Sequence, residues 1–270
     1  MLTIKTPYKE LRSEFMEDFE KCAYWVDKEM RRDRSKFEAL MRSVRRPLNH
    51  KLPFIDYKSK NGNRWRNYCY YSGNNGLMAA MRYDSFCYWE TYGSFGAFTQ
   101  LKFDGVDYIA IFPGHFWQRL CERDPRFKMR GVHTCEEFFT DHRAMAMKMY
   151  DPKDGESRRS IAVFMNGFSA YGVVVSEEHR VVELRTIIPN EQLTGEKRKE
   201  AEDAIITSEQ EKAAYNEIMA MMTMCQNMPL RKILDRLSPF ARKMLAKRLN
   251  EMSEEEFRTL FKEPKEKEYI

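Results

Sequence analysis

The dipeptide Asp104-Gly105 separates two runs in which apolar and polar residues alternate, AFTQLKF (97–103) and VDYIAIF (106–112). A two-residue Asp-Gly loop supplies the positive backbone φ angles that the tightest hairpins need. Alternation with a period of two is typical of a strand that buries one face. The stretch therefore predicts an antiparallel hairpin, and it indicates that the centre of the chain forms a β-sheet.

Further short runs rich in aromatic or β-branched residues lie on both sides of this hairpin, as expected of strands. They cover residues 64–71, 86–92, 160–166, 168–176 and 180–188. Turns are expected at Asn61-Gly62, at Asn166-Gly167 and over residues 176–179. The last three runs predict an antiparallel meander, and the stretch from Pro47 to the Asn61-Gly62 turn is expected to be a loop.

Helices are predicted before, between and after the strands. Apolar residues at steps of three and four predict a helix from Thr6-Pro7 to Arg46, and two more helices are expected over 112–124 and 134–149. Thr134 and Glu137 have the spacing of a capping box for the second of these. Beyond Pro189 the pattern predicts helices over 190–227, over 230–237 and after Ser238-Pro239. The last of these has an apolar stripe of Phe240, Met244, Leu245 and Leu249. A capping box is expected after it, at Ser253 and Glu256.

This order of elements predicts an α+β fold, an antiparallel sheet with two inserted helices. A helical N-terminal arm (1–60), an α+β core domain (61–190) and a helical C-terminal region (191–270) are expected, and 43% apolar residues are enough for a core. Glycine-rich phosphate loops, HExxH and GxSxG are absent. The usual nucleotide-binding, zinc-protease and serine-hydrolase interpretations therefore lack their motifs.

No run approaches the roughly 18 apolar residues that cross a bilayer, and the N-terminus lacks a secretory pattern. A cytoplasmic protein without a membrane partner is expected. The six cysteines form no CxxC pair, which favours reduced thiols. Cys121, His133, Cys135 and His142 match no structural zinc spacing, so neither a metal nor another cofactor is predicted.

Basic residues are concentrated in two segments of a chain whose net charge is +5. Residues 28–46 contain eight Lys or Arg and three acidic residues, and residues 229–250 contain seven Lys or Arg and one acidic residue. Local basic surfaces of this kind are compatible with a nucleic-acid partner, although the overall charge does not require one.

The predicted helix over 112–124 has two chemically distinct faces. His115, Arg119, Glu122 and Arg123 share one face at 100° per residue, and the opposite face consists of Phe116, Trp117, Leu120 and Cys121. The polar face fits a solvated helix with Glu-Arg pairs. It also fits a catalytic face, because a helix start favours a neutral imidazole that can accept a proton while the arginines hold an anion.

The pattern H-x3-R-x2-E-R, followed by a second helix and three strands with Arg185 in the last, resembles RelE/BrnT-like toxin ribonucleases over residues 106–190. The resemblance implies metal-independent RNA cleavage, with His115 as general base or acid and Arg119 and Arg123 as a phosphate clamp. It also implies that Arg185 is a further anion contact and that Glu122 orients an arginine. Tyr171 is then a candidate for stacking or acid catalysis. Such toxins are much smaller than this chain, and a cross-strand ion pair would explain Arg185 equally well.

Two other stretches are candidates for nucleic-acid binding. In one of them, Arg64, Trp65 and Arg66, an aromatic residue lies between two arginines, as in surfaces that bind single-stranded nucleic acid. Alternate aromatic residues of a β-strand also fill protein cores, which is the other interpretation. Arg242 and Lys243, with Lys247 and Arg248, suit either a helix-turn-helix or any solvated helix.

The leading hypothesis is an RNA-binding protein with a RelE/BrnT-like ribonuclease domain. The alternatives are a non-enzymatic nucleic-acid-binding or protein-interaction protein, and a small-molecule-binding fold with a pocket under the aromatic strands. A protein partner such as an antitoxin is compatible with the sequence but cannot be identified from it.

Overall fold

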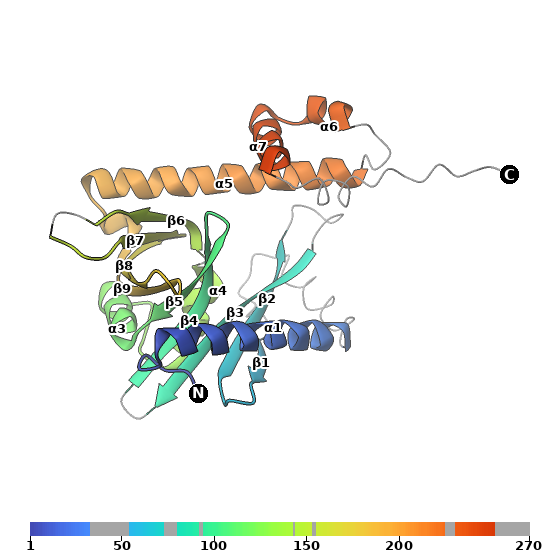
Figure 1. The fold of residues 1–270 in the computed structure, drawn as a ribbon. Coiled ribbons are helices and arrows are strands. Elements are labelled where there is room, and N and C mark those ends of the chain that lie inside the picture. Colours follow the sequence, from blue (N-terminus) through green and yellow to red (C-terminus); the bar gives the residue numbers. More distant parts are fainter. Residues whose placement is uncertain are drawn as a thin grey trace. The chain divides into compact units, whose positions relative to one another are not determined.

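A computed structural model describes residues 1–32, 54–72, 80–91, 94–142, 144–152, 155–224 and 230–251 of the chain (Figure 1). The described residues up to Ile205 form one compact unit, here called the sheet unit, and those from Ile206 onward form a second, the helical unit. The fold is α+β, as predicted, with a nine-stranded, mostly antiparallel sheet.

The first half of the sheet is an antiparallel series of five strands. They are β1 (Phe54–Lys58), β2 (Arg64–Ser72), β3 (Ala80–Thr91), β4 (Ser94–Phe103) and β5 (Val106–Phe112). The predicted hairpin joins β4 to β5, and its loop residues Asp104 and Gly105 have φ angles of 47° and 79°. Both angles are positive, which is why an Asp-Gly pair suits this turn.

The second half of the sheet contains four strands in antiparallel order. They are β6 (Ala144–Tyr150), β7 (Ser160–Met165), β8 (Phe168–Ser176) and β9 (Val181–Pro189). A parallel pairing between β5 and β9 joins the two halves, so that the strand order is β1-β2-β3-β4-β5-β9-β8-β7-β6. The sheet is strongly curved, and β6 at one edge comes back into contact with β4.

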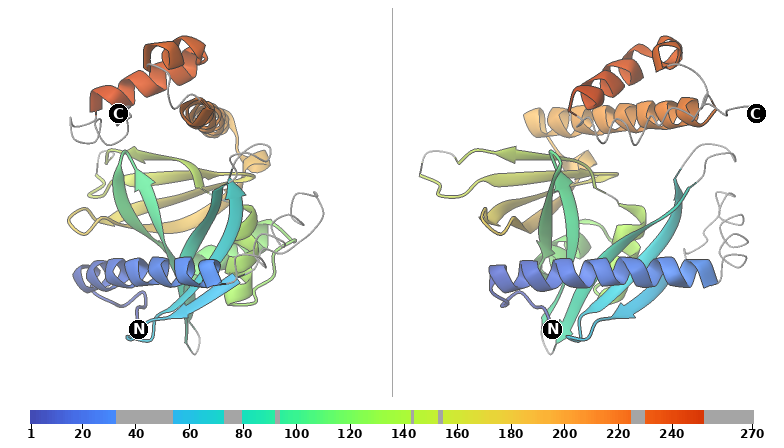
Figure 2. Two further views of the ribbon diagram at one scale, coloured as in Figure 1. Left: turned by 90° about the vertical axis from the view of Figure 1, so that its right-hand side faces the viewer. Right: turned by 45° about the vertical axis from the view of Figure 1, so that its right-hand side comes forward.

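The helix α1 (Tyr8–Arg32) covers one face of the first half, called the outer face, and it crosses the strands (Figure 2). Leu11, Phe15 and Val26 of α1 are buried there against strand residues such as Ile109 and Ile111. The predicted continuation of this helix to Arg46 lies outside the described residues. Since α1 supplies part of the core, it belongs to the compact sheet unit.

The helices α3 (Gly114–Arg123) and α4 (Val132–Asp141) supply residues to the core of the opposite, inner face. Phe112, Phe116, Trp117, Phe138 and Phe139 form an aromatic cluster there, with ring centroids 5.0 to 6.0 Å apart. Residues from both halves of the sheet join this cluster. The inner face therefore holds the main core of the sheet unit.

The sequence prediction was wrong for two strands. Residues 54–58, expected to be a loop, form β1, which pairs with β2. Residues 144–149, expected to extend a helix, belong to β6, which pairs with β7. Ala and Met favour helices intrinsically, but pairing with a distant strand overrides that preference.

The predicted capping box at Thr134 and Glu137 is also wrong. The helix α4 begins after Gly131, and no side chain caps it. Gly131 has φ 59° and ψ −130°, a conformation that favours glycine. Thr134 instead donates a hydrogen bond to the Lys128 carbonyl at 2.7 Å, and Glu137 forms an ion pair with Arg130.

The C-terminal part of the chain is helical, as predicted. Its elements are η1 (Asn190–Gln192), α5 (Gly195–Met224), α6 (Leu230–Arg236) and α7 (Pro239–Glu251). The start of α5 packs on the outer face of the second half of the sheet, and its remainder belongs to the helical unit. The predicted capping box at Ser253 and Glu256 lies outside the described residues. Among the described helices, none is long and apolar enough to cross a membrane.

Candidate nucleic-acid interface

The helix α3 begins immediately after β5 and is held there by its aromatic residues. Pro113 is the N-cap residue, and the Trp117 indole donates a hydrogen bond to the Phe112 carbonyl at 3.0 Å. Phe116, Trp117 and Leu120 are fully buried, as predicted for this face, and Cys121 is half-buried. The sequence FPGHFW thus fixes which side of α3 is turned to solvent.

The exposed side of α3 carries three of the proposed catalytic residues. His115 and Arg119 are exposed one helical turn apart. Arg119 forms an ion pair with Glu122 at 2.9 Å, in which both side chains are more than half exposed. An exposed pair of this kind contributes little to stability, so the Arg119 guanidinium is available to a competing anion.

The other two proposed catalytic residues have different partners. Arg123 donates hydrogen bonds to the Thr186 hydroxyl at 3.2 Å and to the Ile187 carbonyl, both on β9. Arg185 forms an ion pair with Glu183 at 3.1 Å, within its own strand. The three arginines are therefore held by three separate sets of partners.

The aromatic and arginine residues of β2 do not form an exposed stacking surface. Trp65 is 1% exposed and lies against Phe15 of α1, with ring centroids 4.9 Å apart. Arg66 forms ion pairs with Asp56 at 2.7 Å and with Glu136 of α4. Arg64 alone of these three candidates is exposed. The other interpretation of these aromatic residues was that they fill the core, and this is the role of Trp65.

Tyr171 lies on the outer face of β8, where α5 packs. Its ring is half-buried and is covered by the Lys197 ammonium, 5.1 Å from the ring centroid. Burial raises the pKa of the Tyr171 hydroxyl above its ordinary value. Tyr171 is thus placed to hold α5 on the sheet rather than to act beside α3.

The C-terminal candidates lie in the helical unit, whose core is small and apolar. Ala214 and Ile218 of α5 pack with Leu237, Ala241 and Leu245 from the region of α6 and α7. The predicted apolar stripe of α7 needs one correction, because Phe240 is 40% exposed and Ala241 occupies the buried position instead. The side chain of Leu249 is outside the described part of the structure.

A pair of hydrogen bonds sets where α7 begins. Glu217 of α5 accepts hydrogen bonds from the backbone N–H and the hydroxyl of Ser238, each at 2.6 Å. The Ser238 oxygen in turn accepts a hydrogen bond from the Ala241 N–H at 3.3 Å, which is the cap expected from Ser238-Pro239. The cap thus fixes the residue at which α7 begins, and burial of Ala241 and Leu245 determines which of its side chains face solvent.

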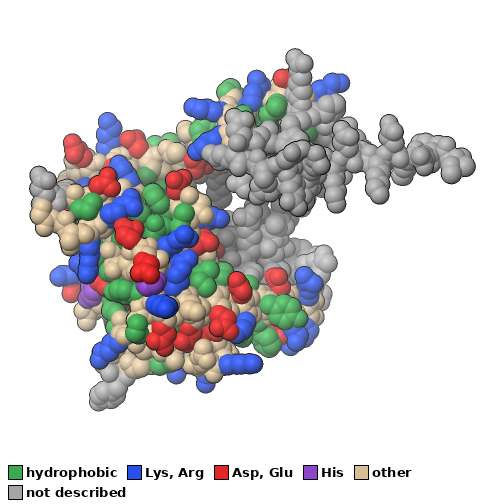
Figure 3. All heavy atoms as spheres, in the orientation of Figure 1, with side chains coloured by type: hydrophobic (Ala, Val, Ile, Leu, Met, Phe, Trp, Pro, Cys, Tyr) green, Lys and Arg blue, Asp and Glu red, His purple; other side chains and the backbone are tan. Residues whose placement is uncertain are grey.

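The exposed side chains of α6 and α7 in the helical unit are mostly basic. Within its described side chains, five cations and one acid of α6 and α7 are exposed: Lys232, Arg236, Arg242, Lys243, Lys247 and Asp235. Several basic side chains project from this part of the molecule in Figure 3. Lys232 and Arg236 were not among the predicted contacts, although the charge count over 229–250 includes them.

Three exposed residues follow one another along α7 at steps of three and four: Phe240, Lys243 and Lys247, here called the α7 stripe. Residues at these steps share one side of a helix. Arg242 has a further role, because it donates hydrogen bonds to the carbonyls of Asp235 and Leu237 at 3.3 and 3.4 Å, where α6 ends. Combining an aromatic ring with cations is how proteins hold single-stranded nucleic acid.

A metal site is not formed by the four residues considered from the sequence. His133 contacts Glu136 at 2.7 Å, and the His142 ring contacts the Asn166 carbonyl. Burial raises the pKa values of the Cys121 and Cys135 thiols, which disfavours the thiolate that binds metals. Among the described residues, no three His, Cys, Asp or Glu side chains are grouped closely enough to hold a metal ion.

No protein-family model matches the chain, and no curated protein or solved structure is significantly similar to it. Functional inference therefore depends on the chemistry of its own residues.

Proposed function

We propose that this chain binds single-stranded nucleic acid, with RNA as the first candidate, through the basic surface of α6 and α7. The observation that carries the proposal is the α7 stripe, in which an exposed phenyl ring lies beside two exposed ammonium groups. The ring of Phe240 can stack on a base, and Lys243 and Lys247 can neutralise phosphates.

The proposal favours binding without cleavage. A metal-independent ribonuclease needs a proton acceptor and several cations around one phosphate. Arg123 and Arg185 have intramolecular partners on β9, which leaves His115 and Arg119 exposed together on α3. These two residues are better suited to a weak contact with a nucleic-acid strand than to stabilising a transition state.

The proposal is tested by fluorescence anisotropy with a labelled 20-nucleotide RNA, a DNA strand of the same sequence and a DNA duplex. Wild type is expected to bind both single strands with a dissociation constant on the order of micromolar at low salt, and the duplex more weakly. The double variant Lys243→Glu, Lys247→Glu should bind at least about tenfold more weakly.

The matched control is Lys58→Glu, Lys60→Glu, which makes the same charge change at two exposed positions of the sheet unit. It should bind within about twofold of wild type. Equal losses in both double variants would show a general charge effect and would contradict the proposal. Incubating wild type and His115→Ala with RNA and EDTA tests cleavage, since 2′,3′-cyclic ends made only by wild type would support the ribonuclease instead.

A further inference from the structure

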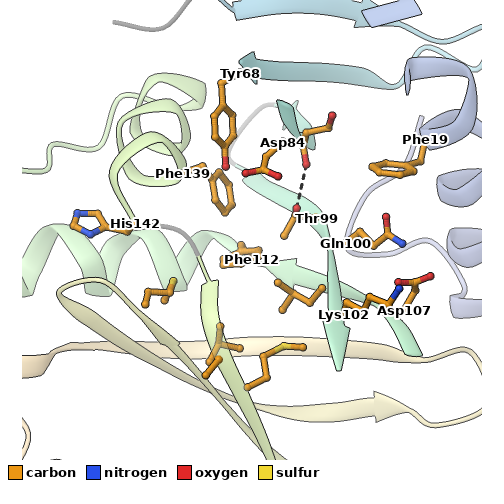
Figure 4. Close-up of a pocket in the computed structure, with 16 residues that line it drawn as sticks. Phe19, Tyr68, Asp84, Thr99, Gln100, Lys102, Asp107, Phe112, Phe139 and His142 are labelled. Atoms are coloured by element: carbon orange, nitrogen blue, oxygen red, sulfur yellow. Dashed lines mark hydrogen bonds between the residues drawn. The ribbon is translucent and has the colours of Figure 1, made fainter. Parts of the chain in front are cut away.

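The sheet divides between β3 and β4. These strands pair from Thr91 with Ser94 as far as Phe86 with Thr99. Beyond that point β3 continues along β2 and β4 continues along β5, so the two hairpins separate. The Thr99 hydroxyl donates a hydrogen bond to the Ser85 carbonyl at 3.1 Å, where the separation begins (Figure 4).

A cavity of about 650 Å³ extends from this division into the inner face of the sheet unit. Its volume lies within the range of small-molecule sites in proteins. The apolar part of its wall comes from both halves of the sheet and from α4, and it includes Leu101, Phe112, Phe139, Met147, Val163 and Met165. An apolar body enclosed by these side chains would be removed from water on several sides.

Polar groups lie at two ends of the cavity. Tyr68 and Asp84 lie beside Phe139 at one end, whereas Gln100, Lys102 and Asp107 lie near Phe19 of α1 at the other (Figure 4). Asp84 is two residues before the buried Phe86 on β3, so the alternation of the strand places its carboxylate on the inner face.

The charges in the described wall favour one class of ligand. Two carboxylates, Asp84 and Asp107, and one ammonium group, Lys102, line the cavity. The His142 ring nitrogen Nδ1 is already engaged with the Asn166 carbonyl. A carboxylate beside apolar walls stabilises a cation and repels an anion, and the effect is stronger in a partly buried site than in water.

We infer that this cavity binds a small amphipathic amine, with its apolar body between Phe112, Phe139 and Met165 and its ammonium group at Asp84. Such a site is separate from the α7 stripe, since all of its described lining residues belong to the sheet unit. The inference therefore does not depend on nucleic-acid binding.

Isothermal titration calorimetry of the full chain tests the inference with two probes of the same aromatic body, tryptamine and indole-3-propionate. Tryptamine is expected to bind at least about tenfold more tightly, because only its side chain carries a positive charge. Asp84→Asn should weaken tryptamine binding by about tenfold and leave indole-3-propionate unchanged or slightly improved. The matched control Asp203→Asn removes the same charge from an exposed residue of α5 that does not line the cavity, and it should alter tryptamine binding less than about twofold.

Met147→Trp tests independently whether the ligand occupies this cavity, because the larger side chain would fill space at the wall formed by the edge strand β6. This variant should abolish tryptamine binding while circular dichroism shows an unchanged fold. Three results would overturn the inference: no tryptamine binding by wild type at 10 millimolar (about the weakest affinity of interest), equal affinity for both probes, or full affinity in folded Met147→Trp.

Discussion

The Arg123 guanidinium lies 3.2 Å from the Thr186 hydroxyl and also donates a hydrogen bond to the Ile187 carbonyl, which joins the end of α3 to β9. Among the described residues, Arg119, one turn earlier, is paired with Glu122 of its own helix. Two arginines on one predicted face thus have different roles, because Arg123 connects distant parts of the chain and Arg119 faces solvent.

Replacing these two arginines should separate the roles. Arg123→Ala is expected to lower the free energy of unfolding by about 1.5 to 3 kcal/mol, because hydrogen bonds from a charged donor to β9 are lost. Arg119→Ala should change it by less than about 0.5 kcal/mol, since its ion pair is exposed. Urea unfolding measures both values, and a larger loss in Arg119→Ala would contradict the assignment.

Trp65 provides a test of whether its role is packing. Trp65→Ala should lower the free energy of unfolding by about 3 to 5 kcal/mol, because a ring buried between β2 and α1 leaves a large cavity. Its exposed neighbour Arg64 is the control, and Arg64→Ala should stay within about 0.5 kcal/mol of wild type. Should folded Trp65→Phe lose RNA binding without losing stability, Trp65 would instead belong to an interface.

The elements that were predicted correctly depend on local signals. Asp104-Gly105 specifies its turn through backbone φ angles, and the buried face of α3 follows from the spacing of Phe116, Trp117 and Leu120. β6 was missed because its helix-favouring sequence becomes a strand only through pairing with β7, a contact between segments separated by a loop.

The arrangement of the candidate sites was less predictable for the same physical reason. The hydrogen-bond partner of an arginine depends on which element packs beside it. Thr186 of β9 is far from Arg123 in the sequence, and only the tertiary structure brings the two together. The cavity had one usable signal, a charged Asp84 on the same strand face as Phe86 within an aromatic run. A pocket under the aromatic strands was one of the alternatives from the sequence, but its second wall comes from β6 and β7, which no local pattern around β3 could indicate.

The contact of α5 with the sheet should be sensitive to acid. The Tyr150 hydroxyl donates a hydrogen bond to Glu200 at 2.6 Å, and Lys148 pairs with the same carboxylate. Burial opposes ionisation of Glu200, but these hydrogen bonds outweigh it and hold the pKa of the carboxyl below its ordinary value of 4.5. The stabilisation is therefore complete above pH 4.5 and is lost as the pH falls through the lower, folded-state pKa.

Glu200→Gln should accordingly lower the melting temperature at pH 7, and its difference from wild type should shrink as the pH falls below 4.5. Glu202→Gln is the control, because Glu202 is exposed and pairs only with Arg198 in the described structure. Thermal melts at several pH values measure both variants. A pH-independent difference for Glu200→Gln would show that ionisation of this carboxylate does not stabilise the contact.

The two kinds of residue in the α7 stripe should affect RNA binding differently. Lys243→Gln is expected to reduce the slope of log affinity against log salt by about 0.7, because one phosphate contact is lost. Phe240→Ala should weaken binding by about 1 to 3 kcal/mol and leave the slope unchanged, since stacking releases no counterions. Anisotropy titrations at four salt concentrations distinguish these effects, and an unchanged slope in Lys243→Gln would exclude Lys243 as a phosphate contact.

The Ser238 cap should determine how well α7 presents this stripe. Ser238→Ala removes the oxygen that accepts from the Ala241 N–H and the hydroxyl that donates to Glu217, and loss of such a cap costs about 1 kcal/mol. Because the helical unit has a small core, this loss should increase local opening, so the amides of α7 should exchange with deuterium several times faster. The sheet unit should be unaffected, and the exposed Ser157→Ala should change neither unit. Unaltered protection of α7 in Ser238→Ala would mean that packing of Ala241 and Leu245 alone holds the helix in place.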